Sequence, residues 1–195
     1  MTAEDINIIC GDNVFKIVDV ETTGFNFGNG DRITDICIYT VDGDTVVGVY
    51  KTLINPERNI PENIQKLTGI TDSMVKWAPK FIDVAGQIYE RLSSGVIVGH
   101  NVSFDLDRFL IPSFKTWYGA PKDFQRIDTM TLARTFSSNL NSFKLQDVYE
   151  ELTGDKQRVM HRAEADVRMT YEVFKRYREF IKFNYSSIIQ AIGNN

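Results

Sequence analysis

Hydrophobic and polar residues in the first third of the chain follow a pattern that is typical of β-strands. Residues 14–20, 33–41 and 45–54 are short runs rich in β-branched and aromatic residues, and turn-forming residues separate them. Asp42-Gly43-Asp44, between the second and third runs, suits a tight hairpin turn. We therefore expect three strands, joined by short turns into an antiparallel meander.

The pattern changes to helical spacing after residue 60. Apolar residues recur every three or four positions across 81–92, which predicts an amphipathic helix. The run 96–98 is entirely apolar and is typical of a central parallel strand, and 125–128 is a candidate last strand. A meander followed by alternating helices and strands predicts an α/β fold with a mixed β-sheet flanked by helices. Further helices are predicted at residues 60–69, 104–114, 129–136, 145–152 and 163–183.

The composition is ordinary for a folded protein. The 195 residues are 43% hydrophobic and 25% charged, which excludes a largely disordered chain. This length suits a single domain over 1–195, with its core at residues 14–183 and a short C-terminal extension. No apolar run approaches membrane-span length, and the acidic start lacks the features of a signal peptide. We therefore expect a cytoplasmic protein that has no membrane partner.

Two carboxylates mark the end of the first predicted strand. Asp19 and Glu21 stand two residues apart, so on a strand their side chains point to the same face. Two like charges at the end of a buried strand are costly unless a cation lies between them, and carboxylate oxygens suit Mg²⁺ or Mn²⁺. The pair indicates a candidate metal site. Two residues alone leave the alternative of a solvated strand end with two incidental acids.

Two further acids stand at the starts of predicted helices. Asp105 follows the short strand at 96–98, and Asp166 lies about one turn into the last long helix, five residues after His161. Each acid taken alone needs no role beyond a favourable interaction with a helix N-terminus. The chemical information lies in the combination of the three acidic clusters and in their order along the chain.

Together these clusters resemble the three signature motifs of the DEDDh exonucleases, the superfamily of the proofreading ε subunit of bacterial DNA polymerase III. Segments 52–56, 67–72 and 128–134 also match family landmarks, and the resemblance covers about residues 14–178. Arg162 occupies the position where the sister subgroup carries a tyrosine, which indicates the histidine type. The matching motifs are Asp19-Val20-Glu21-Thr22-Thr23-Gly24, Gly99-His100-Asn101 with Phe104-Asp105, and His161-Arg162-Ala163 with Asp166.

The resemblance implies a fold, a cofactor and a set of catalytic residues. The family fold is a ribonuclease-H-like mixed β-sheet flanked by helices, and its four carboxylates hold two Mg²⁺ or Mn²⁺ ions per active site. Carried over by position, Asp19 bridges both ions, Glu21 and Asp166 complete one site, and Asp105 supports the other. His161 is then the general base, because imidazole titrates near neutral pH. The implied enzyme is a 3′–5′ exonuclease that releases nucleoside 5′-monophosphates.

Substrate contacts are expected around the same motifs. As in the family, backbone N–H groups of Thr22 and Thr23 are expected to contact the terminal nucleotide. Phe25, together with Phe27, either stacks or wedges against bases or anchors its loop to the core. The basic residues around His161 either contact the phosphate backbone or are solvated loop charges. These basic residues are Lys156, Arg158 and Arg162.

Two residues near the motifs are expected to have structural roles. His100 is the less suitable base, because the family places the base in the third motif, and we interpret it as a hydrogen-bonding residue. Asp128 precedes a predicted helix and is interpreted as its cap.

The substrate and the class of protein are less sharply indicated. DNA with a single-stranded 3′ end is favoured, because the spacing follows the ε-like pattern. RNA remains an alternative, since discrimination depends on contacts to the 2′-hydroxyl that no motif reports. A catalytically inactive nucleic-acid-binding or scaffold module is the other class, but it would have lost an acid or the histidine, and all five are present.

Association with a DNA polymerase is a further expectation. A proofreading subunit usually carries a C-terminal tail that tethers the polymerase, and here the segment 186–195 is short. We therefore expect either a free-standing nuclease or a subunit that is held by its globular surface.

Overall fold

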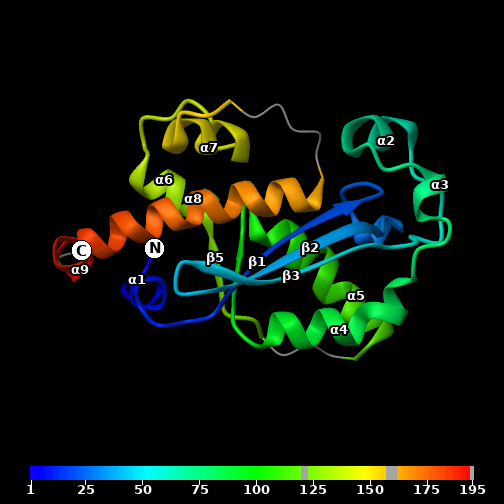
Figure 1. Cartoon of the computed structure of the whole chain (residues 1–195), viewed down its shortest axis with the longest axis horizontal. Helices are drawn as coiled ribbons and strands as arrows, with labels where there is room; N and C mark the ends of the chain where they lie inside the picture. Colours follow the sequence, from blue (N-terminus) through cyan, green and yellow to red (C-terminus); the bar gives the residue numbers. More distant parts are fainter. Residues whose placement is uncertain (120–122, 157–161, 194–195) are drawn as a thin grey trace.

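A mixed β-sheet forms the centre of the molecule in the computed structural model, which describes residues 1–119, 123–156 and 162–193 (Figure 1). The strand order is β3-β2-β1-β4-β5. β2 is antiparallel to both β1 and β3, whereas β4 is parallel to both β1 and β5. The strands are β1 (Phe15–Thr22), β2 (Ile33–Asp42), β3 (Thr45–Leu53), β4 (Val96–Gly99) and β5 (Arg126–Asp128).

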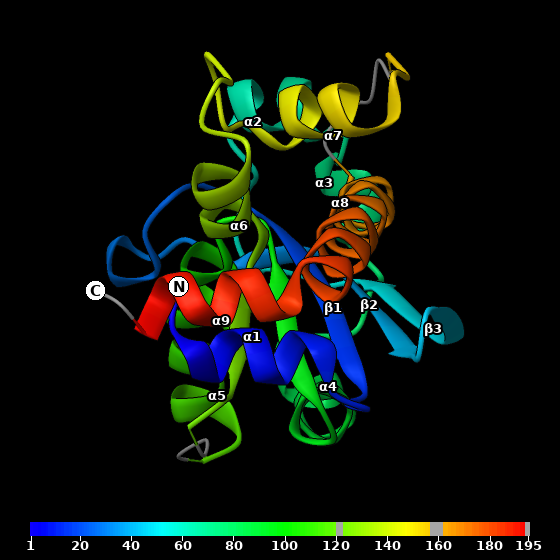
Figure 2. The same cartoon turned by 90° about the vertical axis from the view of Figure 1, so that its left-hand side faces the viewer.

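Helices cover both faces of this sheet (Figures 1 and 2). On one face, α8 (Ala163–Phe183) packs across β1 and β2, and α6 (Thr129–Phe136) and α7 (Leu145–Thr153) pack against α8. On the other face lie α4 (Phe81–Ser93) and α5 (Ile111–Trp117). No helix in the described ranges combines the length and the apolar character that a membrane crossing requires.

Strand β1 contributes to a different hydrophobic cluster on each face. Ile17 packs in the cluster beneath α8, while Val18 packs in the cluster with α4 and α5. Side chains alternate along a strand, so Asp19 and Glu21 share the face of Ile17. The burial pattern of β1 therefore directs both acids toward α8.

Smaller helices close the two ends of the sheet. Beyond the end of β1 lie α2 (Glu62–Thr68) and α3 (Asp72–Val75), as Figure 1 shows. At the opposite end, α1 (Ala3–Cys10) and α9 (Tyr185–Gly193) lie side by side (Figure 2). The helices α2 and α3 share a small apolar cluster of Ile60, Ile64, Ile70 and Val75.

The structure confirms the mixed sheet, the antiparallel meander and the central parallel strand, with boundaries that differ by one or two residues. Several elements differ from expectation, and α3 and α9 lie outside the helices predicted above. The helix expected at 104–114 begins as a π-helical segment, η2 (Phe104–Leu110), and becomes α-helical only in α5. The helix α1 was not predicted at all. A short 3₁₀ turn, η1 (Phe27–Asn29), lies in the loop after β1.

Arg178 ties three elements together at the end of the sheet farthest from α2. Its side chain is 2% exposed and donates to the carbonyl oxygens of Ile9 at 2.8 Å and Gly11 at 3.0 Å. It also bonds to the carbonyl of Gly43 and forms an ion pair with Asp44 at 2.6 Å. One guanidinium therefore joins α8 to the end of α1 and to the hairpin between β2 and β3.

Candidate active site

The acids of the first motif lie at the end of β1, side by side in the sheet. Asp19 pairs with Cys37 and Glu21 with Asp35 on β2, and the pairing register shifts directly after Glu21. This irregularity ends the regular ladder where the chain enters the following loop. Both carboxylates consequently project from the face of the sheet that α8 covers, close to the C-terminal end of β1.

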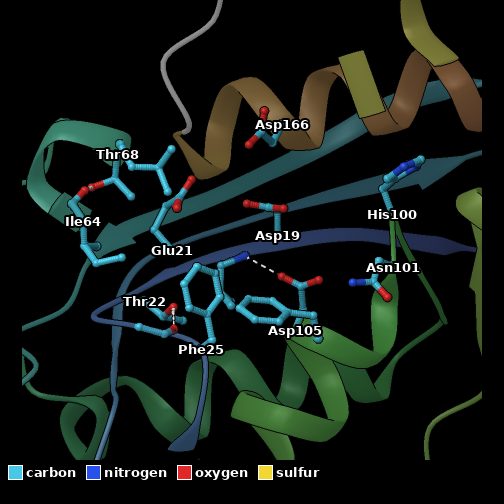
Figure 3. Close-up of a pocket in the computed structure, with 14 residues that line it drawn as sticks. Asp19, Glu21, Thr22, Phe25, Ile64, Thr68, His100, Asn101, Asp105 and Asp166 are labelled. Atoms are coloured by element: carbon cyan, nitrogen blue, oxygen red, sulfur yellow. Dashed lines mark hydrogen bonds between the residues drawn. The ribbon is translucent and has the colours of Figure 1, made fainter. Parts of the chain in front are cut away.

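Helix α8 brings a third carboxylate to the same place. Asp166 lies in its first turn and is 8% exposed. One oxygen from each of Asp19, Glu21 and Asp166 lies within 4.8 Å of the others. Figure 3 shows the three side chains pointing toward one another across the gap between β1 and α8. The expected convergence of the first and third motifs is therefore present in the structure.

The fourth acid approaches from the other side of Asp19. Asp105 lies in the π-helical segment η2 and is 3% exposed. Its Oδ1 accepts a hydrogen bond from the backbone N–H of Val20 at 2.9 Å, which fixes the carboxyl against β1. In Figure 3, Asp19 lies between Asp105 and Asp166. A π-helical turn is uncommon and often found at functional sites, and here it carries the acid of the second motif.

Burial and mutual repulsion raise the pKa values of these carboxyls. Burial raises the pKa of Asp19 well above its usual range, and Asp105, Glu21 and Asp166 raise it further. Burial, Asp166 and Asp35 raise the pKa of Glu21 to about 8. Burial also raises the pKa of Asp105 to about 8, although the hydrogen bond from Val20 opposes the shift. Without a cation, the cluster therefore holds protons at neutral pH.

The donor set of this cluster fits a hard divalent cation. All ligand atoms are carboxylate oxygens, which suit Mg²⁺ or Mn²⁺ better than soft metals. Neither Asp19 nor Glu21 forms an ion pair with a lysine or arginine within the described ranges. A bound cation would place positive charge directly between these carboxyls.

A cavity opens above the acids, and its walls include residues that the sequence did not single out. The lining includes Phe25 and Phe104 and, from α2, Ile64, Leu67 and Thr68. Figure 3 shows Phe25 across the cavity from Ile64 and Thr68. The only sequence signal for the α2 wall was the match of residues 67–72 to a family landmark. Also in the lining are Thr22, Gly24, His100 and Asn101.

The two phenylalanines of the loop after β1 have different surroundings. Phe25 is 62% exposed, and its ring meets Phe104 edge-on at 6.4 Å. Phe27 packs against Trp117 at 5.9 Å and lies under the guanidinium of Arg32 at 4.3 Å. Of the two interpretations left open, stacking on a base therefore suits Phe25, and anchoring of the loop suits Phe27.

Thr22 and Thr23 also differ. Thr22 lines the cavity, and its hydroxyl donates to the carbonyl of Gly24 at 2.5 Å. Thr23 is 1% exposed, and its N–H donates to the carbonyl of Arg32 at 2.8 Å. Its hydroxyl donates to Asp31 at 3.2 Å. The N–H of Thr23 is therefore used within the fold, which favours a structural role for this residue over the expected contact with a nucleotide.

The expected basic residues are only partly covered by the structure. His161 and Arg158 lie outside the described residues. Lys156 forms an ion pair with Glu150 at 3.0 Å. Arg162 forms one with the buried Asp35 at 3.3 Å, directly before α8.

His100 and Asp128 have the structural contacts that were expected of them. The Nδ1 of His100 lies 2.9 Å from the hydroxyl of Thr129, and its Nε2 lies 2.8 Å from the carbonyl of Phe143. Burial lowers the pKa of His100. Asp128 caps α6 by accepting from Met130 N at 2.8 Å, and the same oxygen accepts from Asn101 N at 3.0 Å.

Comparison with known sequences identifies relatives for most of the chain. Residues 17–174 match the sequence profile of the family described as "Exonuclease". The DNA polymerase III subunit epsilon of Aquifex aeolicus is 31% identical over 174 residues, which cover 89% of this chain and 85% of that protein. The 3′–5′ exonuclease DinG of Bacillus subtilis is 32% identical over 160 residues, which cover 82% of this chain but only 17% of DinG. A PolC-type DNA polymerase III of Thermotoga maritima is 36% identical over 88% of this chain and 12% of that protein.

Solved structures share the fold. Exonuclease I of E. coli, solved with a dT13 oligonucleotide, aligns with a TM-score of 0.74 at 22% identity, over 88% of this chain and 43% of that one. Exonuclease X, solved with 5′-overhanging duplex DNA, aligns with a TM-score of 0.66 at 23% identity, over 85% of this chain and 92% of that one. At these identities the likeness concerns the arrangement of sheet and helices.

A mixed sheet with four acids gathered at the end of its central strand defines a ribonuclease-H-like nuclease domain. The profile match and the similarity to the epsilon subunit along most of both chains are more specific. The chain belongs to the exonuclease family, whose members of this type are 3′–5′ exonucleases and hence phosphodiester hydrolases.

Proposed function

We propose that this chain is a metal-dependent exonuclease that removes nucleotides one at a time from the 3′ end of single-stranded DNA. The observation that carries the proposal is the convergence of Asp19, Glu21 and Asp166 within 4.8 Å at the floor of an open cavity, with Asp105 beside them. The products are nucleoside 5′-monophosphates.

Asp19 has the central place in this proposal. Two Mg²⁺ or Mn²⁺ ions, when bound, supply the positive charge that activates water and stabilises the leaving 3′ oxygen. Glu21 and Asp166 would hold one ion together with Asp19, and Asp105 would hold the other. The position of Asp19 between Asp105 and Asp166 in Figure 3 supports its role as the shared ligand. The raised pKa values imply that the carboxyls release their protons when they bind cations.

His161 is the proposed general base. The support is its place in the third motif, five residues before Asp166. Arg162, the next residue, is anchored to Asp35, so the chain on this side of α8 is tied to β2 close to the acids. A neutral imidazole in this place would accept the proton of the attacking water.

The cavity suits a terminal nucleotide with an unpaired base. Phe25 offers an exposed ring on one wall, and Leu67, 45% exposed, offers an apolar surface on the other. A base held between these two side chains would be separated from any complementary strand, which favours single-stranded ends.

DNA is the proposed substrate, and RNA is the second candidate. Similarity to a DNA polymerase III subunit, and to two exonucleases solved with DNA, supports the first. The second is supported by a structural neighbour described as a 3′-exonuclease that recognises a histone mRNA stem-loop, which aligns with a TM-score of 0.71 at 17% identity.

Association with a DNA polymerase is also proposed, on the basis of the epsilon and PolC-type relatives. Stoichiometric co-purification with a polymerase from the source cells would support it. Purification as a fully active protein without such a partner would favour the free-standing nuclease.

The decisive experiment compares digestion of 3′-labelled and 5′-labelled single-stranded DNA and RNA in Mg²⁺, Mn²⁺ and EDTA. We expect metal-dependent release of the 3′ label as a mononucleotide. Asp19→Asn and His161→Ala should each reduce the rate by about two orders of magnitude or more. Glu90→Gln is the matched control, because Glu90 is an exposed acid of α4 on the other face of the sheet.

Three outcomes would change the proposal. Digestion by Asp19→Asn at the wild-type rate would remove the catalytic assignment. Binding of nucleic acid without hydrolysis under any metal would favour the scaffold class. Faster digestion of RNA than of DNA would reverse the order of the two substrates.

A further inference from the structure

The side chain of Trp77 is unusually exposed, although tryptophan is the largest aromatic side chain and usually buries much of its apolar surface. It lies between α3 and α4 and is 86% exposed, and the other tryptophan of the chain, Trp117, packs against Phe27 and Phe81. Large aromatic side chains left in water commonly mark a surface that binds a partner.

The backbone beneath Trp77 is held firmly on both sides. The side-chain amide of Asn55 donates to the carbonyl of Lys76 at 3.2 Å, and the backbone N–H of Asn55 donates to the carbonyl of Pro79 at 2.9 Å. Ala78 N donates to the carbonyl of Val75 at 3.1 Å, which closes the turn. The indole therefore projects from a fixed turn, and binding would require little ordering of the backbone.

A lysine ammonium lies over the indole. The Nζ of Lys76 lies 5.0 Å from the centre of the Trp77 ring. The neighbouring Lys66 and Lys80 form ion pairs with Glu62 and Glu57, but Lys76 has none within the described ranges. An aromatic ring can stack on a nucleobase, and a lysine ammonium that forms no ion pair can bind the adjacent phosphate.

Trp77 directly follows the packed unit that forms one wall of the active-site cavity. Ile64 lines the cavity and also packs with Val75 in the cluster shared by α2 and α3. Val75 is two residues before Trp77. Figure 1 shows α2 and α3 following one another beyond the end of β1. A strand that leaves the cavity past α2 would run toward α3, which ends two residues before Trp77.

We propose that Trp77 and Lys76 form a second binding point for the substrate strand, at which a base 5′ of the terminal nucleotide stacks on the indole. Lys76 then contacts an adjacent phosphate. The inference rests on the proposed function, because it takes the occupant to be the single strand that enters the active site. It predicts that strand length beyond the terminal nucleotides increases affinity through this contact.

The test measures equilibrium binding of oligothymidylates in EDTA, where hydrolysis is blocked, by intrinsic fluorescence and by anisotropy of 5′-labelled strands. Strands of about a dozen nucleotides should quench the fluorescence of Trp77, and dinucleotides should not. Trp77→Ala should weaken binding of the long strand by about fivefold or more and leave dinucleotide binding unchanged. Trp77→Phe should retain most of the affinity, and Lys76→Gln should reduce the salt dependence of binding.

Phe183→Ala is the matched control, because Phe183 is a 90% exposed aromatic at the far end of α8 and should leave affinity for both lengths unchanged. Equal affinity of wild type and Trp77→Ala for long strands would overturn the inference even if digestion proceeds normally. Length-dependent quenching without digestion in Mg²⁺ would support the binding point while removing the exonuclease activity. Failure of the wild type to bind strands of any length in EDTA would overturn the binding point, whereas the exonuclease activity is judged separately by digestion in Mg²⁺.

Discussion

Glu21 shows, at the scale of single residues, how an active site opposes the stability of its own fold. Its side chain is 9% exposed and lies near Asp166 and Asp35, and burial with these charges raises its pKa to about 8. In the unfolded chain the carboxyl titrates near its ordinary value of 4.5. Between these values the folded protein binds more protons than the unfolded chain, so stability decreases as the pH rises. Asp19 shifts in the same direction and adds to the effect.

We therefore expect the metal-free protein to lose stability between about pH 5 and about pH 8, by several degrees in Tm. Glu21→Gln should flatten this dependence, because the amide does not titrate. The measurement is thermal unfolding in EDTA across this range, with Glu90→Gln as the control. A Tm that stays constant or rises with pH in the wild type would contradict the assigned pKa shifts.

Phe25 and Phe27 separate binding from stability within one loop. Phe25→Ala should raise KM for a single-stranded substrate several-fold with little change in Tm, because its ring is exposed in the cavity. Phe27→Ala should lower the free energy of unfolding by about 1–2 kcal/mol, because its ring packs on Trp117 and under Arg32. Steady-state kinetics and urea unfolding of both variants test this. A loss of stability in Phe25→Ala together with a raised KM in Phe27→Ala would show that the two roles are exchanged.

At this scale the sequence predicted part of the site directly. The two-residue spacing of Asp19 and Glu21 was enough to place them on one face of a strand. Asp105 and Asp166 required the resemblance to a family, because no local pattern reports which distant segments converge on β1. The wall formed by Leu67 was missed for a physical reason. An exposed apolar side chain on a short helix looks the same in sequence whether it lines a cavity or only meets solvent.

At the scale of elements, α8 connects the active site to the opposite end of the fold. Asp166 lies in its first turn. Three turns later, Arg178 donates hydrogen bonds to carbonyl oxygens at the end of α1 and in the β2–β3 hairpin. Both residues are buried on the sheet side of the helix. The helix therefore carries buried polar side chains near both of its ends.

Arg178→Met should lower the free energy of unfolding by about 2–4 kcal/mol, because it leaves buried carbonyl oxygens and Asp44 without a donor. Activity of the folded fraction, measured well below the Tm, should remain near wild type. Arg176→Met is the control, since Arg176 is exposed on the same helix. If Arg176→Met proved as destabilising as Arg178→Met, the loss would not come from the buried hydrogen bonds of Arg178.

The elements also show where periodicity is informative. The long amphipathic helices, such as α4 and α8, were predicted because their apolar faces repeat over three turns or more. Helix α1 was not predicted, although Thr2 and Asp5 form a capping box that is readable in sequence. The π-helical turns of η2 were not predictable, because apolar spacing does not distinguish π from α hydrogen bonding at this length.

At the scale of the whole molecule, the active site exists only when β1, η2 and α8 are brought together. The acids lie on segments far apart in the chain, and α8 packs on β1, which has β2 on one side and β4 on the other. Repulsion among Asp19, Glu21 and Asp166 opposes the packing of α8 on β1. A cation bound between the three carboxylates would turn this repulsion into a net attraction.

Mg²⁺ or Mn²⁺ at millimolar concentration should therefore raise the Tm of the whole fold, because the ions bind the folded cluster and not the unfolded chain. The shift should increase from about pH 6 to about pH 8, as the carboxyls release the protons that compete with the metal. Asp19→Asn should abolish the shift and should also raise the Tm in EDTA at the alkaline end of this range, since an amide replaces a buried carboxyl whose ionisation is unfavourable in the folded protein. Glu90→Gln should respond to metal as the wild type does. A Tm that neither ion changes at any of these pH values would mean that the four acids do not form a metal site.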